Sequence, residues 1–307
     1  MPFDHMNCQV CAQSRGDIVH TAREMMFGLR TVFHYAECKS CGSLELTDPP
    51  NEWSLYYPSS YYSYSPLNVE TFKYRLKNRL CLTPLGKLLA KYRTELRTKP
   101  LFLVGLRPKW RILDVGCGRG ELLYHLKSAG CKHVTGVDPY LTATVPEDLD
   151  VRACSLSEVS GRWDLIMFHH SFEHMVDARN VLTTVKNLLA PSGWCIIRIP
   201  VIGWAWERFG VNWVQLDAPR HRFIYSVNGF KTLASMAGLK VLRVDHDSFE
   251  LQFFSQLYER DIPLCDLSKH PFSNQELAGF RNCSRNLNRQ GHGDQAVFYL
   301  QQRAEGD

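Results

Sequence analysis

The stretch Trp110-Arg-Ile-Leu-Asp-Val-Gly-Cys-Gly-Arg-Gly120 decides the fold of this chain. It begins with a short apolar run, ends in a glycine-rich turn and leads into the helical pattern of residues 121–129. Because glycine lacks a Cβ, the backbone of such a turn can bend sharply and let a ligand come close. The N–H groups that open the helix point toward that ligand. The stretch therefore predicts a strand, a tight turn and a helix, with a ligand at the turn.

Two carboxylates accompany the turn. Asp114 ends the first apolar run, and Asp138 ends a second run eighteen residues after Gly120. A carboxylate at the second position can accept both hydrogen bonds from a ribose diol. A carboxylate at the first position would repel a pyrophosphate but suits the ammonium group of an amino acid. The glycine turn alone would also fit a dinucleotide or a plain tight corner.

The order of these motifs resembles a known enzyme family. Residues 113–120 resemble motif I of the class I S-adenosylmethionine (SAM)-dependent methyltransferases, and Gly136-Val-Asp-Pro139 resembles their motif II. The resemblance implies a Rossmann-like α/β fold with a seven-stranded sheet, and SAM as the cofactor. The residues that it places beside SAM are Asp114, Gly116, Cys117, Gly118, Gly120, Asp138, Pro139, Ser155, Leu156 and His169.

From residue 109 onward, apolar runs alternate with helical patterns, as in an open parallel sheet. The predicted strands are 112–115, 133–137, 149–154, 163–168, 194–199, 240–244 and 296–301, with helices at 121–129, 176–189 and 227–237 and a further helix within 248–294. The motifs around strand four resemble small-molecule methyltransferases that include ubiquinone O-methyltransferases. That subgroup inserts elements over the active site where residues 201–223 interrupt the alternation.

Four cysteines near the N-terminus form two CxxC pairs, Cys8 with Cys11 and Cys38 with Cys41. Four thiolates in this spacing suit a structural zinc ion and leave no coordination position for chemistry. An alternating stretch, residues 29–35, predicts a strand that leads to the second pair, as in a zinc ribbon. Four unrelated free thiols are one alternative, and a redox CxxC is another, although neither pair lies in a βαβ pattern.

Two segments follow the cysteine pairs. The tyrosine-rich stretch 53–64 favours packing between the parts of the chain, and a cover over a substrate pocket is the alternative. Residues 71–99 hold nine Lys or Arg and one acidic residue, in two amphipathic helical patterns. A solvated helix face is the preferred interpretation, and peripheral contact with a membrane or another anionic partner is the alternative. The predicted domains are 1–50, 51–100 and 101–303.

Bulk properties limit the class of protein. The net charge of +5 is modest and does not by itself imply nucleic acid as a partner. Eleven cysteines, without an N-terminal apolar leader, are better read as reduced thiols and metal ligands than as disulfides. No apolar run approaches the roughly 20 residues of a membrane span. We therefore expect a cytoplasmic protein; its oligomeric state stays open.

Histidines are the candidates for acceptor chemistry. His169 and His170 follow the predicted fourth strand, and the resemblance places His169 near the methionine part of SAM and His170 at the acceptor. His170 is the first candidate base because no sequence neighbour occupies it. His221, in Pro-Arg-His, is the second candidate base or an anion clamp. Glu173 is excluded as a base by an expected position inside the next helix. A hydrogen-bonded structural histidine is the alternative for each.

The whole arrangement resembles zinc-ribbon-bearing methyltransferases of bacterial polysaccharide and natural-product clusters. It predicts a SAM-dependent methyltransferase that acts on a hydroxyl of a sugar, a glycan precursor or another polar small molecule. An RNA or protein methyltransferase, which would grip a polymer through the cysteine module and the basic helices, is the alternative in another substrate class. A SAM-sensing or scaffold protein is the non-enzymatic alternative.

Overall fold

The computed structural model describes residues 7–14, 16, 18–58, 99–141, 145–265 and 271–303. Residues 59–64 of the tyrosine-rich stretch and 71–98 of the basic segment lie outside the described residues, and so do the predictions made for them. The described beginning of the tyrosine-rich stretch does pack inward. Tyr56 is buried there, with its ring centroid 5.4 Å from that of Phe33.

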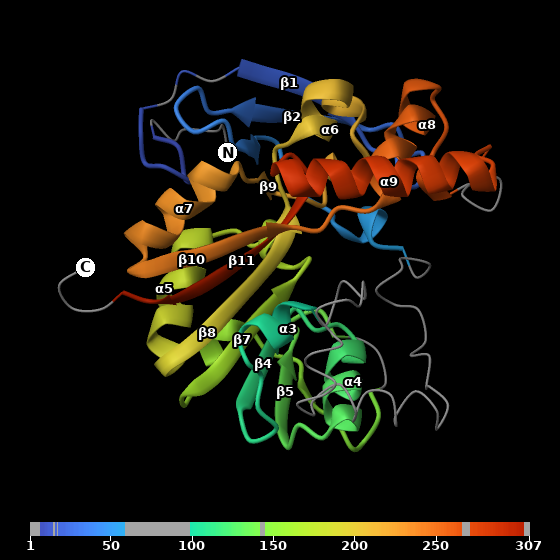
Figure 1. Ribbon diagram of the computed structural model, residues 1–307. Coiled ribbons are helices and arrows are strands. Elements are labelled where there is room, and N and C mark those ends of the chain that lie inside the picture. Colours follow the sequence, from blue (N-terminus) through green and yellow to red (C-terminus); the bar gives the residue numbers. More distant parts are fainter. Residues whose placement is uncertain are drawn as a thin grey trace.

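A seven-stranded sheet forms the centre of the molecule (Figure 1). Its strand order is β10-β11-β8-β7-β4-β5-β6, with β11 antiparallel to both of its neighbours and the pairs from β8 to β6 parallel. All seven predicted strands are confirmed. They are β4 (Arg111–Val115), β5 (His133–Val137), β6 (Asp150–Arg152), β7 (Trp163–His169), β8 (Leu189–Pro200), β10 (Leu239–His246) and β11 (Gln295–Gln302). The predicted Rossmann-like α/β fold with a seven-stranded sheet is thereby confirmed.

Helices cover both faces of this sheet. One face packs against α5 (Ala178–Leu188) and α7 (Val227–Met236), and the other packs against α3 (Lys99–Leu103) and α4 (Glu121–Ala129). Successive strand residues point to opposite faces, so Leu113 joins the first core and Ile112 the second. This double coverage explains why the parallel strands are continuous apolar runs in the sequence.

A second, four-stranded sheet lies above the end of the central sheet (Figure 1). Its order is β1-β2-β3-β9, formed by β1 (Ile18–Arg23), β2 (Val32–Glu37), β3 (Leu44–Leu46) and β9 (Phe223–Ile224). The predicted strand at 29–35 corresponds to β2, whereas β1 was not predicted. Because β9 follows β8 by more than twenty residues and pairs with β3, the N-terminal sheet is completed by a strand from the second half of the chain.

Three helices pack on this second sheet, namely α6 (Trp204–Phe209), α8 (Ser255–Glu259) and α9 (Asn274–Gln290). They share a core with it that includes Tyr35, Trp206, Trp213 and Leu257. The helix expected between residues 248 and 294 is therefore confirmed. The short 3₁₀ helices are η1 (Ser54–Tyr56), η3 (Leu156–Glu158), η4 (Phe172–His174), η5 (Gly210–Asn212), η6 (Val214–Leu216) and η7 (Glu250–Phe254).

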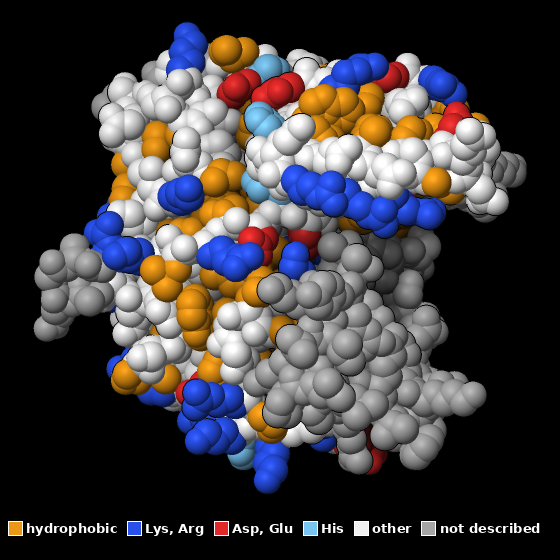
Figure 2. Space-filling view, viewed as in Figure 1, with side chains coloured by type: hydrophobic (Ala, Val, Ile, Leu, Met, Phe, Trp, Pro, Cys, Tyr) orange, Lys and Arg blue, Asp and Glu red, His pale blue; other side chains and the backbone are white. Residues whose placement is uncertain are grey.

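The outer surface carries a basic row along α9 (Figure 2). Arg281, Arg285 and Arg289 recur every four residues, so they share one face of the helix. Only Arg281 has a carboxylate partner among the ion pairs of the described residues, namely Glu250. In the described part of the chain, no helix has both the length and the apolar character that a membrane span requires.

Candidate active site

The glycine turn after β4 requires its glycines. Gly116 has φ +71° and Gly120 has φ +80°, a region that side chains disfavour. A Cβ on Gly116 would lie 2.4 Å from the Cβ of Ser171. The turn is held against β5 by a hydrogen bond from Gly116 N to Val137 O of 2.8 Å. The backbone of the turn is thus fixed close to the chain that follows β7.

Asp138 faces this turn from the end of β5. Its Oδ2 accepts a hydrogen bond from Gly118 N at 3.0 Å, and its Oδ1 accepts one from Tyr140 N at 2.9 Å. A carboxylate oxygen can accept more than one hydrogen bond, so each oxygen keeps capacity for a further donor. The structure thus places Asp138 beside the turn, and its contact with a ribose diol stays a prediction.

Asp114 lies beneath the turn and is 3% exposed. Burial, and then the negative charge of Asp138, raise the pKa of its carboxyl to about 7. A cation bound beside it would favour the ionised form and reverse that shift. The two carboxylates therefore form an acidic end of the site that suits a positively charged ligand group.

The other residues predicted to contact the cofactor lie around the same edge. The side chain of Cys117 turns back against β5, where a Cβ on Gly136 would come within 2.5 Å of its Sγ. Leu156 is buried in η3. Pro139 follows β5, Ser155 precedes η3, and His169 is the last residue of β7. Contact of all these residues with a cofactor stays a prediction.

His170 leaves β7 with φ +53° and is held on both sides. Its Nε2 accepts a hydrogen bond of 2.9 Å from Nη1 of Arg198, and its Nδ1 lies 3.4 Å from Oε1 of Glu173. Arg198 in turn donates from Nε to Oδ2 of Asp247 at 2.6 Å. No sequence neighbour was expected to occupy His170, but Glu173, three residues later, lies against it, and Arg198 reaches it from β8. Its role as a base stays a prediction.

Glu173 lies in η4, before α5, and not inside the following helix as expected. The helix begins only at Ala178 because Asp177 caps it. The carboxylate of Glu173 is fully buried. Burial by itself would raise its pKa, but the contact with His170 and the neighbouring His174 and His221 hold the pKa at about 2. A buried carboxylate among three histidines is thus ionised at neutral pH.

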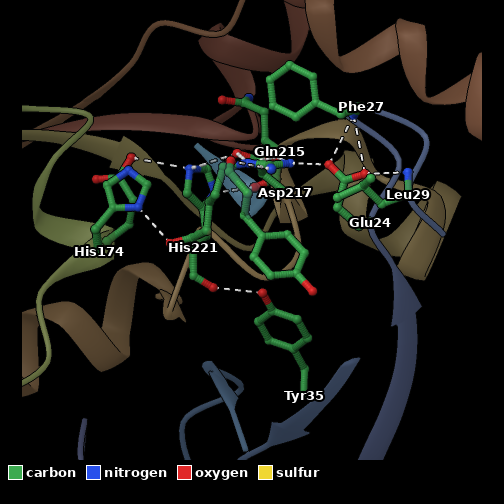
Figure 3. A network of polar contacts seen from close by, with 11 residues as sticks. Glu24, Phe27, Leu29, Tyr35, His174, Gln215, Asp217 and His221 are labelled. Carbon is green, nitrogen blue, oxygen red and sulfur yellow. Dashed lines mark hydrogen bonds and ion pairs between the residues drawn. The ribbon is translucent and has the colours of Figure 1, made fainter. Parts of the chain in front are cut away.

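His221 reaches this carboxylate from the segment after η6. Its Nδ1 donates to Gln215 O at 2.7 Å, and its Nε2 lies 3.8 Å from Oε1 of Glu173. Burial lowers the pKa of His221 to about 4, so the ring is neutral. The ring of His174 lies beside it, with centroids 4.9 Å apart (Figure 3). The structure therefore brings His170 and His221 to the same carboxylate.

Arg220 fastens the segment that carries His221 to the N-terminal sheet. It is 1% exposed and donates to both oxygens of Asp217 at 3.0 Å, to Oε1 of Glu24 at 2.8 Å and to Tyr56 O at 3.0 Å. Tyr35 adds a hydrogen bond from its hydroxyl to His221 O of 2.7 Å. With its donors occupied in this way, Arg220 positions the site and does not face a ligand.

The four N-terminal cysteines come together as predicted. Cys8 and Cys41 have their sulfurs 3.9 Å apart, Cys11 and Cys38 have theirs 3.8 Å apart, and all four sulfurs lie within 4.8 Å of one another. A tetrahedral zinc ion with bonds of about 2.3 Å places its sulfur ligands about 3.8 Å apart. The donor set and its geometry thus fit zinc. The cluster packs on the start of α7, where Ser226 N donates to Ser43 Oγ at 3.0 Å.

Sequence reasoning missed Arg198 and Glu24 as parts of the site. Arg198 had a signal, because it is an arginine inside the apolar run of β8, near the carboxyl end where such sheets bind ligands. No pattern in the sequence singles out Glu24, because it precedes a loop of ordinary composition. Its two oxygens accept hydrogen bonds from the N–H groups of Phe27 at 3.0 Å and Leu29 at 2.9 Å (Figure 3).

With this geometry in place, the chain can be compared with known proteins. Residues 88–244, just over half of the chain, match the family described as "Methyltransferase domain". The chain belongs to this methyltransferase family. Family membership supports SAM as the cofactor and methyl transfer as the activity. No curated protein matches the chain.

Solved structures with a similar fold include three methyltransferase-type proteins. A mycolic acid cyclopropane synthase complexed with S-adenosylhomocysteine (SAH) is 18% identical, with 74% of this chain and 93% of that chain covered and a TM-score of 0.47. A SAM-dependent methyltransferase from Archaeoglobus fulgidus is 18% identical, with 72% and 100% covered and a TM-score of 0.45. One from Mesorhizobium loti is 14% identical, with 70% and 100% covered and a TM-score of 0.44. These likenesses concern the fold alone.

Proposed function

We propose that the protein transfers the methyl group of SAM to a hydroxyl of a sugar, a glycan precursor or another polar small molecule. The contact between the glycine turn and the start of η4 supports this proposal. Ser171 packs against Gly116 and donates from Oγ to Val115 O at 2.6 Å. Glu173 and His174 follow two and three residues later, so a polar cluster begins directly beside the turn.

In this proposal the turn and its two carboxylates hold the cofactor. Asp138 accepts hydrogen bonds from the ribose diol, and Asp114 faces the ammonium group of the methionine part. Gly116, Gly118 and Gly120 admit the cofactor to the turn. Ser155 and Leu156 lie beside the adenine, with Cys117, Pro139 and His169 completing the cofactor contacts. SAM supplies an activated methyl group, and holding an acceptor in line with it provides much of the rate acceleration.

On the acceptor side, His221 activates the hydroxyl. Its Nε2 lies 3.8 Å from Glu173 and 3.9 Å from Asp217, beyond hydrogen-bond range, so this nitrogen keeps its lone pair for the acceptor. His170 is the second candidate, because the hydrogen bond from Arg198 already uses the lone pair of its Nε2. Histidines and carboxylates around the acceptor suit a hydroxyl-bearing molecule better than an apolar one.

Cys8, Cys11, Cys38 and Cys41 hold a structural zinc ion in this proposal. With four sulfur ligands the ion has no open position, so it stabilises the N-terminal sheet and takes no part in methyl transfer. Through β3 and β9, this sheet supports the segment that carries His221.

Incubation with labelled SAM and a panel of sugars, nucleotide-sugars and a metabolite extract tests the function. We expect SAH together with a methylated polar product, identified by mass spectrometry. His221→Ala should form far less product, and His133→Ala, an exposed histidine at the start of β5, serves as the matched control. Methylation of RNA or protein alone, with every small acceptor untouched, would overturn the proposal.

A further inference from the structure

A second group of metal-ligand side chains lies on the acceptor side. Glu173, His174 and His221 each offer one ligand atom, and these atoms lie within 4.8 Å of one another. Two of the residues come from η4, and the third comes from the segment after η6, which Arg220 fastens in place. Two imidazoles and one carboxylate are a ligand set used by zinc and by divalent iron, with positions left open for other ligands.

Both histidines are already oriented as metal-bound histidines are. His174 lies with Nδ1 2.6 Å from Arg220 O, and His221 lies with Nδ1 2.7 Å from Gln215 O. A carbonyl oxygen only accepts, so each Nδ1 carries the proton and each Nε2 keeps a lone pair. This second hydrogen bond, which fixes the tautomer, usually accompanies a histidine that binds a metal.

The carboxylate of Glu173 supplies an independent observation. Its side chain is fully buried, and neither oxygen accepts a hydrogen bond from the described part of the chain. The nearest side-chain nitrogens are Nδ1 of His170 at 3.4 Å and Nε2 of His221 at 3.8 Å. A buried carboxylate without hydrogen bonds is costly unless a cation accompanies it. The carboxylate therefore points to a cation that the three side chains enclose.

The surrounding framework is rigid. Gln215, whose carbonyl holds His221, donates from its side chain to Oδ2 of Asp294 at 2.6 Å. Trp213 donates to the same oxygen from Nε1 at 2.9 Å. Arg220, whose carbonyl holds His174, makes the buried contacts with Asp217 and Glu24. Two separate networks thus keep the ligand atoms in place before any ion arrives, which lowers the cost of binding one.

We propose that Glu173, His174 and His221 bind one divalent transition-metal ion, and that the acceptor hydroxyl occupies an open position on it. This use of the ion rests on the proposed function, whereas the binding of the ion does not. Bound to the ion, the hydroxyl loses its proton to solvent more readily. Its oxygen then forms the O–CH₃ bond while the S–CH₃ bond of SAM breaks, and SAH leaves as a neutral thioether. His221 thereby activates the acceptor as a ligand of the ion.

Metal titration of the full chain, with zinc already bound to the cysteine cluster, tests the site. The probe is Mn²⁺, which prefers harder ligands than thiolates, and its free concentration is followed by electron paramagnetic resonance. We expect one Mn²⁺ per chain in addition to the zinc. His174→Ala and Glu173→Gln should bind it at least tenfold more weakly. His246→Ala should bind it normally, because this histidine also meets a carbonyl, Gly293 O at 2.9 Å, but lies outside the cluster.

Circular dichroism and SAM affinity of each variant show whether it is folded, and His174→Ala, which truncates a half-buried side chain, covers a failure of Glu173→Gln. Absence of Mn²⁺ binding to the parent, or equal binding by His174→Ala and His246→Ala, would overturn the inference. The proposed function stands or falls separately. Metal binding without methylation of any polar acceptor would refute the proposed function and leave the metal site standing. Chelator-insensitive turnover without metal binding would refute the metal site and leave the proposed function standing.

Discussion

The proposed cofactor half and the proposed acceptor half of the site are built in different ways. The main part of the proposed cofactor half, the glycine turn with Asp114 and Asp138, lies within residues 114–138, on two neighbouring strands. The acceptor half uses side chains from distant parts of the chain, namely Glu24, Glu173, Arg198 and His221. One half is local and sits on the central sheet. The other depends on the N-terminal sheet being docked above it.

This difference implies that the two halves can fail separately. The glycine turn, which we propose to hold the cofactor, is fixed by β4, α4 and the core beneath them. The segment that carries His221 is fixed by Arg220, by the hydroxyl of Tyr35 and by the pairing of β9 with β3. Damage to the N-terminal sheet should therefore abolish turnover and leave SAM binding, and the following predictions test that separation.

The largest effect is expected from removal of the proposed zinc ion. Structural zinc contributes about 10–16 kcal/mol of binding free energy in zinc-finger peptides, so Cys38→Ser should open the N-terminal sheet. We expect native mass spectrometry to show loss of one zinc, and limited proteolysis to cut within residues 18–58. Turnover should disappear while calorimetry shows nearly parental SAM affinity.

Cys283→Ser is the matched control, because this cysteine is exposed on α9. A Cys38→Ser protein that keeps its zinc, or one that keeps an ordered N-terminal sheet without it, would contradict the assignment. If zinc removal abolished turnover without any change in fold or SAM affinity, the ion would be catalytic.

The second-largest effect is expected on kcat, from loss of the histidine that activates the acceptor. His221→Ala should lower kcat by a factor of about 10²–10⁴, the usual range for loss of a group that activates the reacting proton. His170→Ala should lower it less, since Arg198 already occupies Nε2 of this ring. Single-turnover kinetics on both variants with saturating SAM measures the difference. A larger loss in His170→Ala would reverse the order, and no loss in either would leave positioning alone to carry the reaction.

The third prediction concerns the stability of the fold, which should fall when Arg220 is replaced. Arg220→Met leaves the carboxylates of Glu24 and Asp217 buried without their cation, and breaking a buried pair in this way costs about 3–5 kcal/mol. Urea unfolding measures the loss. Arg208→Met removes the more exposed pair with Glu259 and should cost at most about 1 kcal/mol. Equal losses in the two variants would show that Arg220 fastens nothing.

A smaller effect concerns the pH dependence of SAM binding. The pKa of Asp114 is about 7 without ligand, so the carboxyl is neutral below that pH and charged above it. A cationic cofactor favours the charged form, so SAM affinity should rise as pH rises through 7, by at most about tenfold per pH unit. Below pH 7, binding should also release a proton, which calorimetry in buffers of different ionisation enthalpy detects.

The stability of the fold should depend on pH in the opposite direction to SAM affinity. Because the folded-state pKa lies above the ordinary value of 3.8, Asp114 favours the fold at low pH, and this contribution is lost between about pH 4 and 7. Asp114→Asn should remove both dependences. A steep pH dependence of SAM affinity that survives in Asp114→Asn would assign it to another group.

The comparison of the two halves also explains what the sequence could predict. The glycine turn, Asp114 and Asp138 follow from local pattern, because strand, turn and helix are adjacent in the chain and carry their signals within a few residues. The seven strands were predicted for the same reason. The four cysteines were predicted because their CxxC spacing is itself a ligand geometry.

The acceptor half could not be predicted in this way. That Glu24 meets Arg220, or that Arg198 meets His170, depends on contacts 196 and 28 residues apart in sequence. Glu173 was expected inside a helix, but Asp177 caps that helix, which begins only at Ala178. The carboxylate that lies between the histidines was therefore not predicted. Long-range packing of β9 on the N-terminal sheet decides these positions, and no local pattern encodes it.

The central claim, that a local cofactor half binds SAM independently of the acceptor half, is tested most directly by calorimetric titration of SAM into three proteins. Asp138→Ala loses hydrogen bonds to a charged group worth about 1.5–3 kcal/mol, so its affinity should fall about ten- to hundredfold below that of the parent. His221→Ala should bind SAM as the parent does. Parental affinity in Asp138→Ala, or an equal loss in His221→Ala, would contradict the account.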